Sequence, residues 1–173
     1  MKHPPDLFEQ INNAIFDLQS ADYQSYEQPI RRLGRLLKSP DLALLNETLT
    51  ADLDLDAFLE KSEASQGSML GSATLYWPDD DREILGLRLL LVRRFSEQPV
   101  FMERFGHTFF YSGTKIMSSI NAVTGQLIIP FVRDYRAYIH AGAVTEGKVV
   151  RPLSNKVFVV HGHDSEMRET VAR

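Results

Sequence analysis

Apolar residues recur at intervals of three and four along most of this chain, a spacing that predicts amphipathic helices. Asp6 can cap a first helix, and Pro29 falls near the start of a second. The predicted apolar stripes are Leu7, Ile11, Ala14, Ile15 and Leu18 in the first helix, and Tyr26, Ile30, Leu33 and Leu37 in the second. Ser39-Pro40-Asp41 stops the second helix, and short helices are expected around 42–49 and 57–59. The pattern predicts a mainly α-helical domain.

A further helix should begin just after Trp77, because Pro78 keeps the preceding residue out of the helical region and an acidic cap follows. Apolar side chains surround this helix on most faces, so we expect it to be central. Gln98 and Pro99 end it.

The longest helical pattern runs from Thr114 to Ala141. If it is continuous, residues 115–140 would span about 39 Å, but Gly125 and Pro130 predict a kink or break in the middle. Uncharged polar residues lie beside the apolar ones, which suits either a helix–helix contact or the wall of a pocket. We expect residual apolar surface on this long helix to form a dimer contact.

Aromatic residues gather around Gly106 and His107, namely Phe101, Phe105, Phe109, Phe110 and Tyr111. They could stack on a nucleobase or pack in the core. Because no basic cluster is interleaved with them, we favour packing. His107 is expected to be structural or partly exposed, since it has no Ser or Cys partner in a recognised motif.

Two charged clusters each allow a functional and a structural interpretation. Arg31, Arg32, Arg35 and Lys38 could form a surface for phosphate or nucleic acid, or a solvated helix face, which we favour. Asp52, Asp54 and Asp56 could bind a divalent cation. The remaining ligands of an EF-hand loop are missing, so we favour solvated charges that cap a helix.

The composition excludes several classes of protein. The chain has 173 residues, 43% of them hydrophobic, and a net charge of −4, so no overall field favours nucleic acid or an anionic membrane. It has no cysteine, which excludes disulfides and thiolate chemistry. No signal peptide or spanning apolar run is present, and we expect a cytoplasmic protein.

The last eighteen residues, KVFVVHGHDSEMRETVAR, differ from the rest. An apolar run rich in Val predicts a buried strand, Gly162 allows a sharp turn, and Asp164 or Ser165 can cap a helix. This is the opening of a βα unit, whose turn could bind an anion through backbone N–H groups, with His161 and His163 on phosphate or ribose. Zinc binding by the two histidines is disfavoured, because two ligands are too few for a site. A plain strand-to-helix turn is the remaining alternative.

This same stretch resembles the opening strand and helix of bacterial TIR-like nucleotide-binding domains. The resemblance covers residues 156–173, about a tenth of the chain. It implies a flavodoxin-like α/β domain that binds a nucleotide such as NAD and cleaves it in anti-phage defence. The catalytic glutamate of TIR enzymes would lie past Arg173, so no catalytic residue or bound cofactor is expected here. The implied nucleotide-binding residues are His161, Gly162, His163, Asp164 and Ser165.

We therefore predict a helical sensing or oligomerisation domain over 1–150, with a hinge at 62–72, a linker at 151–155 and an incomplete TIR-like domain at 156–173. The chain would be the non-catalytic, self-associating part of a longer protein, for which the resemblance implies a TIR-type NAD hydrolase. A self-contained helical interaction module without enzymatic activity is the alternative.

Overall fold

The computed structural model describes residues 6–69 and 73–145, with side chains through Gly142, and within this part the chain is helical and contains no strand. The mainly α prediction is confirmed for this region. The elements in chain order are α1 (Leu7–Gln19), α2 (Glu27–Leu37), the short 3₁₀ turn η1 (Pro40–Leu42), α3 (Ala43–Thr50), α4 (Leu55–Glu63), α5 (Asp81–Glu97), α6 (Pro99–Phe109), α7 (Ile116–Val123), the π-helical turn η2 (Thr124–Ile128) and α8 (Ile129–Thr145).

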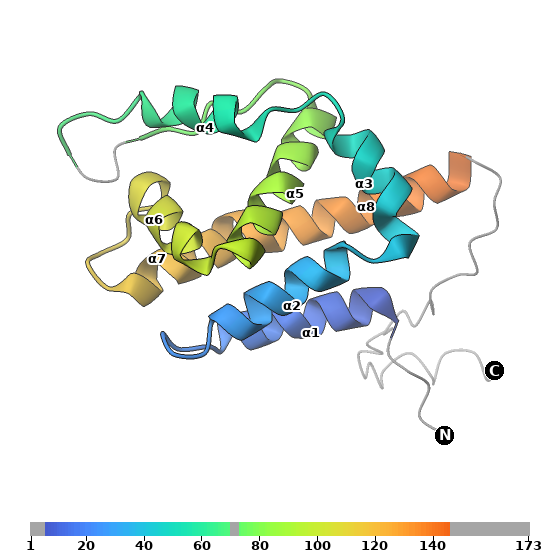
Figure 1. The fold of residues 1–173 in the computed structure, drawn as a ribbon, viewed down its shortest axis with the longest axis horizontal. Coiled ribbons are helices and arrows are strands. Elements are labelled where there is room, and N and C mark those ends of the chain that lie inside the picture. Colours follow the sequence, from blue (N-terminus) through green and yellow to red (C-terminus); the bar gives the residue numbers. More distant parts are fainter. Residues whose placement is uncertain (1–5, 70–72, 146–173) are drawn as a thin grey trace, which may run out of the picture.

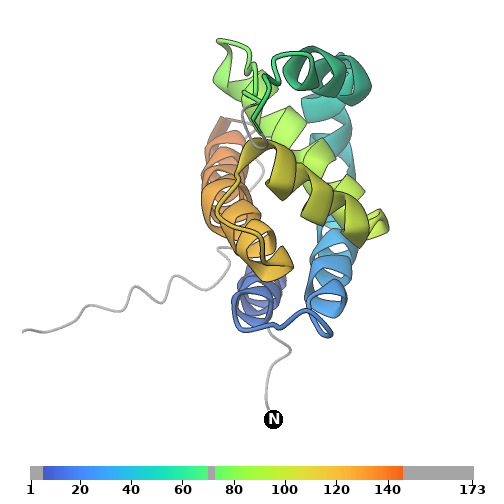
Figure 2. The same cartoon turned by 90° about the vertical axis from the view of Figure 1, so that its left-hand side faces the viewer.

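Helix α5 runs through the middle of the domain, as its apolar character predicts (Figures 1 and 2). It contacts α2, α3, α4, α6, α8 and η2. Leu89, Leu91, Val92 and Phe95 are completely buried along it. Helices from both halves of the sequence therefore share one core built around α5.

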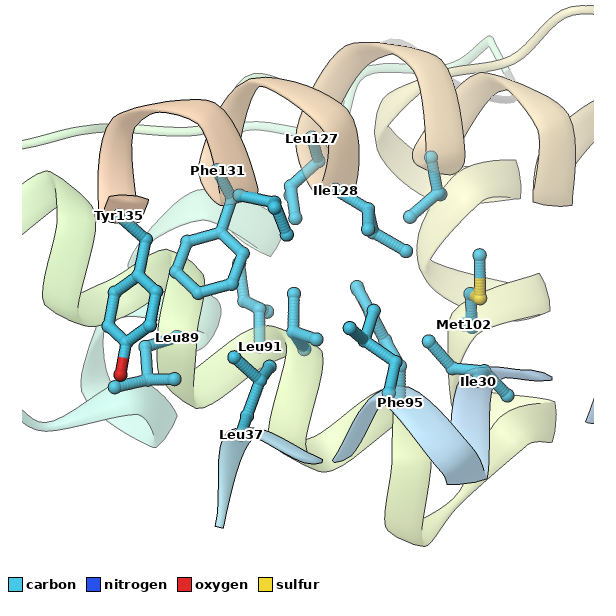
Figure 3. Packing of buried hydrophobic residues seen from close by; sticks show 14 of the residues in the cluster. Ile30, Leu37, Leu89, Leu91, Phe95, Met102, Leu127, Ile128, Phe131 and Tyr135 are labelled. Atoms are coloured by element: carbon cyan, nitrogen blue, oxygen red, sulfur yellow. The ribbon is translucent and has the colours of Figure 1, made fainter. Parts of the chain in front are cut away.

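The core is continuous from α1 to α8. Figure 3 shows Phe131 and Tyr135 of α8 facing Leu89 and Leu91 of α5, while Ile30 reaches the same interior from α2. The predicted stripe of α2 is buried at all four positions, and in α1 the stripe is buried except for half-buried Leu7. Burial of this apolar surface is the main driving force for folding.

Phe8 was not part of the predicted stripe, yet it is only 3% exposed. Its ring stacks on His140 of α8 at 6.2 Å between centroids, and the Arg136 guanidinium lies 5.5 Å from its centre. The first turn of α1 is therefore held against the last turns of α8.

Helix α5 begins at the acidic cap that the sequence predicts. The Asp80 carboxylate accepts hydrogen bonds from the backbone N–H groups of Arg82 (2.7 Å) and Glu83 (3.3 Å). These bonds satisfy two amides that have no partner inside the helix.

Asp80→Ala is expected to lower the free energy of unfolding by about 1 kcal/mol, because those two N–H groups lose their acceptor. Asp79→Ala removes the same charge one residue earlier, where no capping bond is recorded among the described residues, and should have little effect. Urea unfolding of both variants measures the difference. Equal losses would show that charge, not capping, stabilises the helix start.

The run predicted from Thr114 to Ala141 forms two α-helices, α7 and α8. The kink or break predicted between them is a π-helical turn. Pro130 lacks an amide N–H and its ring conflicts with the carbonyl of residue 126 in a regular α-helix. The wider turn at Thr124–Ile128 ends two residues before Pro130, so the carbonyl of residue 126 lies inside the π turn and not in a regular α-helix. The buried Thr124 hydroxyl donates to the Ile120 carbonyl, 2.8 Å away.

Five of the apolar residues of this helical run face the interior of the same chain. Ile120, Val123, Leu127, Phe131 and Tyr135 are at most 1% exposed. Other apolar residues of the run are only partly buried, namely Ile116, Met117, Ile129, Tyr138 and Ile139. Self-association through the surface that they leave exposed stays a prediction.

Three helix crossings depend on glycine. A Cβ at Gly34 of α2 would overlap the side chain of Ser96 of α5, and one at Gly86 of α5 would overlap the Leu49 carbonyl of α3. At Gly106 of α6 a Cβ would lie 2.6 Å from the Ser119 carbonyl of α7. At Gly86 and Gly106 the obstacle is a backbone carbonyl of the neighbouring helix, whereas at Gly34 it is the Ser96 side chain.

A buried hydrogen-bond chain ties α8 to α3 and α2. The Tyr135 hydroxyl donates to Asn46 Oδ1 at 2.5 Å, and Asn46 Nδ2 donates to the Leu37 carbonyl at 2.8 Å. Tyr135 is 0% exposed and Asn46 2% exposed. Burial raises the pKa of the Tyr135 phenol to about 12, despite the opposing effects of Arg93 and the Asn46 bond.

Part of the predicted hinge at 62–72 is hydrogen-bonded to the irregular segment that follows it. Ser62 ends α4 as a fully buried side chain and accepts a hydrogen bond from the Tyr76 N–H. Ser65 Oγ accepts one from the Thr74 N–H at 2.7 Å. Residues 70–72 lie outside the described part, and the hinge remains a prediction.

The predicted βα unit at 156–173, the linker at 151–155 and the end of the helical domain after residue 145 also lie outside the described residues.

Candidate functional site

The residues assigned to a nucleotide-binding turn, His161, Gly162, His163, Asp164 and Ser165, lie outside the described part of the chain. Their geometry is therefore untested. The candidate sites that follow come from residues 6–69 and 73–142.

Phe105 of the aromatic cluster belongs to the core, Phe101, Phe109 and Phe110 pack against the core half-buried, and Tyr111 is exposed. Phe105 is 2% exposed and lies between four other rings. Its centroid is 5.2 Å from Phe95, 6.0 Å from Phe101, 4.8 Å from Phe109 and 5.9 Å from Phe110. These distances are typical of tilted and edge-to-face aromatic packing. Phe105 therefore has no free face for a base.

His107 has a serine partner that the sequence did not reveal. Its Nδ1 lies 3.3 Å from Ser119 Oγ, and its ring meets Tyr111 edge to face. A Ser–His pair can begin a nucleophilic site, but Ser119 is 0% exposed inside the α6–α7 crossing. The pair therefore joins two helices. The buried Thr124 hydroxyl, in contrast, bonds the Ile120 carbonyl within its own helical run. Neither Ser119 nor Thr124 is exposed to a ligand.

Two of the three clustered aspartates have structural roles, Asp54 as a helix cap and Asp56 in an ion pair. Asp54 accepts from the Ala57 N–H at 2.9 Å as the cap of α4. Asp56 binds Arg94 of α5 at 2.6 Å, and this hydrogen bond lowers the pKa of the Asp56 carboxyl. Among the described residues no group of three or more His, Asp or Glu is placed to hold a metal ion.

The basic face of α2 lines a depression on the surface of the α1–α2 hairpin. The two helices are antiparallel neighbours in Figure 1, and α1 supplies Asp17 and Ser20 to one wall. The volume of the depression is about 660 Å³. Its full lining is Asp17, Ser20, Ala21, Ser25, Gln28, Pro29, Arg31, Arg32 and Arg35. We call this the arginine-lined depression.

The turn between the two helices is fixed by Asp22. Its carboxylate accepts from the Ser25 hydroxyl at 2.6 Å and from the Gln24 N–H at 3.0 Å. The Ser25 bond is the main reason that the pKa of the Asp22 carboxyl lies below its usual value. These local bonds in the turn therefore help to fix the position of α1 relative to the arginines of α2.

Two of the three arginines in the depression hold exposed ion pairs. Arg32 lies 3.2 Å from Asp17, and Arg31 lies 3.4 Å from Glu27 one helical turn earlier. Lys38, outside the depression, binds Glu97 of α5 at 2.7 Å. Arg35 has no ion-pair partner among the described residues. The interpretation of this part of α2 as a solvated helix face accounts for the paired cations Arg31, Arg32 and Lys38. It gives no role to the side chain of Arg35.

A second depression, of about 590 Å³, lies between the start of α5 and α8. Its charged residues balance, with Asp81 and Asp134 against Arg82 and Arg88. Arg88 is already held at 3.2 Å by Asp134 and at 5.4 Å by the Trp77 ring. These contacts stabilise the fold and leave the arginine-lined depression as the better candidate for an anion.

None of the described helices combines the length and the apolar character that crossing a membrane requires.

The described fold is thus a helical domain with a cationic depression on its first hairpin. The uncharacterized protein YuaY of Escherichia coli strain K12 is 46% identical to this chain over 168 residues, which make up 97% of this chain and 56% of that relative. The chain therefore spans a little over half the length of the relative. No family model matches the chain, and no solved structure matches it.

Proposed function

We propose that this chain is the regulatory part of a TIR-like nucleotide-binding protein, in which the helical domain senses a ligand or sets the oligomeric state. The intact protein would bind or hydrolyse NAD in anti-phage defence through a domain that begins near residue 156. That assignment depends on the resemblance of KVFVVHGHDSEMRETVAR to the start of such domains. The longer relative supports a role for the helical domain within a larger protein.

The observation that carries the regulatory role is the contact between α1 and α8. Phe8 stacks on His140, and Arg136 lies over the same ring. The hairpin that bears the arginine-lined depression is therefore in direct contact with the helix that leads toward residue 156. A ligand that shifts α1 would bias the position of α8, which is the physical requirement for coupling two sites.

The test is NAD cleavage by the longer product of the natural reading frame, measured beside the 173-residue chain. We expect turnover by the longer protein and none by the 173-residue chain. Sedimentation should show self-association of both. A stop codon directly after Arg173, or turnover by the short chain, would contradict the proposal. Self-association without any NAD cleavage by the longer protein would favour the helical interaction module.

A further inference from the structure

We propose that the arginine-lined depression binds a nucleotide, with the phosphates on Arg31, Arg32 and Arg35 and the base against the exposed ring of Phe16. The nucleotide would be the ligand that the helical domain senses. Its role as a signal rests on the proposed function, but its binding to α1 and α2 does not.

The lining of the depression is rich in hydrogen-bond donors. The lining holds three guanidinium groups, the Ser20 hydroxyl, the Gln28 amide and a single carboxylate, Asp17, while the Ser25 hydroxyl already donates to Asp22. The formal charge of the lining is therefore +2 within a chain whose net charge is −4. Guanidinium groups match the oxygens of phosphate in pairs, so this lining selects an anion with several oxygens.

The existing ion pairs do not block such a ligand. The side chains of Arg31 and Arg32 are 46% and 42% exposed, and those of their partners Glu27 and Asp17 are 48% and 55% exposed. Exposed ion pairs contribute little stability because water and salt screen them. Arg35 is exposed and has no ion-pair partner among the described residues. A phosphate can engage Arg35 directly and compete with the weak pairs for the other two arginines. At Arg31 it would also compete with a long bond of 3.5 Å from the guanidinium to the Ser96 carbonyl.

Size and net charge favour a small ligand over a nucleic acid. A volume of about 660 Å³ lies within the range of small-molecule sites, roughly 300 to 1,000 Å³. A long polyanion would also meet the negative field of the whole chain, whereas a small anion responds mainly to the three nearby guanidinium groups.

Phe16 supplies an aromatic surface next to the depression. It lies on α1 one helical turn before Ser20, which lines the depression, and residues four apart share a helix face. Its side chain is 68% exposed, and no ring contact of Phe16 is recorded among the described residues. A single exposed apolar side chain is common on protein surfaces, so the position of Phe16 beside the depression, and not its exposure alone, is what suits a ligand. A nucleobase would cover it by stacking, as in single-strand binding proteins.

Calorimetric titration of the 173-residue chain with ADP, inorganic pyrophosphate and adenosine tests the proposal. ADP should bind most tightly, pyrophosphate more weakly, and adenosine least. Arg35→Gln should weaken ADP about tenfold, because a charge-assisted bond is lost. Lys115→Gln removes the same charge at the start of α7, outside the depression, and should change the affinity by less than about twofold.

Phe16→Ala tests the contribution of the base to binding separately from that of the phosphates. It should weaken ADP about tenfold through lost stacking and leave pyrophosphate unchanged. Both residues are exposed, so circular dichroism should show wild-type folding. No binding of ADP at millimolar concentration, equal effects of the Arg35 and Lys115 variants, or pyrophosphate binding as tightly as ADP would each overturn the proposal. ADP binding with no NAD cleavage by the longer protein would contradict only the proposed function.

Discussion

Gly86→Ala is expected to lower the free energy of unfolding by about 2–3 kcal/mol. The new Cβ would overlap the Leu49 carbonyl and the Leu53 side chain, and the carbonyl cannot move without shifting α3. Alanine favours a helix over glycine by up to about 1 kcal/mol, which is too little to offset the overlap. Thermal or urea unfolding of the variant measures the loss.

Gly125→Ala is the matched control, because nothing lies within 4 Å of a Cβ at that position. It should be neutral or slightly stabilising. The α2–α5 crossing offers a rescue experiment: Gly34→Ala should destabilise strongly, and adding Ser96→Gly should recover much of the loss, since Ser96 is the residue that the Cβ meets. Additive losses in the double variant would contradict the close approach of these helices.

The second large effect is a loss of stability at alkaline pH. An unfolded tyrosine ionises near pH 10, whereas burial raises the pKa of Tyr135 to about 12. Between these values the unfolded state releases a proton that the folded state retains. The stability is fully present below pH 10 and falls as the pH rises to 12, by about 2–3 kcal/mol for a difference of about two pKa units.

Tyr135→Phe is the control for this titration. At pH 8 it should cost about 1–2 kcal/mol, because Asn46 Oδ1 loses its only recorded donor in a buried place. The variant has no phenol to ionise at this position, so its stability should fall less between pH 10 and 12. The difference between wild type and variant should therefore shrink as the pH rises. Parallel pH profiles would show that Tyr135 does not titrate on unfolding.

The sequence predicted what depends on local periodicity and local caps. The stripe of α2 is buried at Tyr26, Ile30, Leu33 and Leu37 because a spacing of three and four places these side chains on one face. The start of α5 after Trp77 follows from Pro78 and an acidic cap. Both features involve residues within a few positions of each other.

Contacts between distant residues could not be predicted in this way. Gly34 meets Ser96, and Asn46 meets Tyr135, across 62 and 89 positions. A single sequence carries no signal for such pairs until the helices are placed. The same is true of Ser119, whose pairing with His107 arises from the α6–α7 crossing.

The sequence predicted only the α2 side of the arginine-lined depression. The basic face of α2 was clear from Arg31, Arg32 and Arg35, but the depression also needs Asp17 and Ser20 from the antiparallel α1. The turn at Asp22 brings the two walls together, and its bonds were not predicted. The interpretation of His161–Ser165 as a nucleotide-binding turn stays a prediction.

The stacking of Phe8 on His140 places the start of α1 beside the last turns of α8. Because α1 begins beside the end of α8, polypeptide attached before α1 and polypeptide attached after α8 would join the domain at the same end. Two segments attached at these points would therefore start close together, and the length of the domain would not separate them.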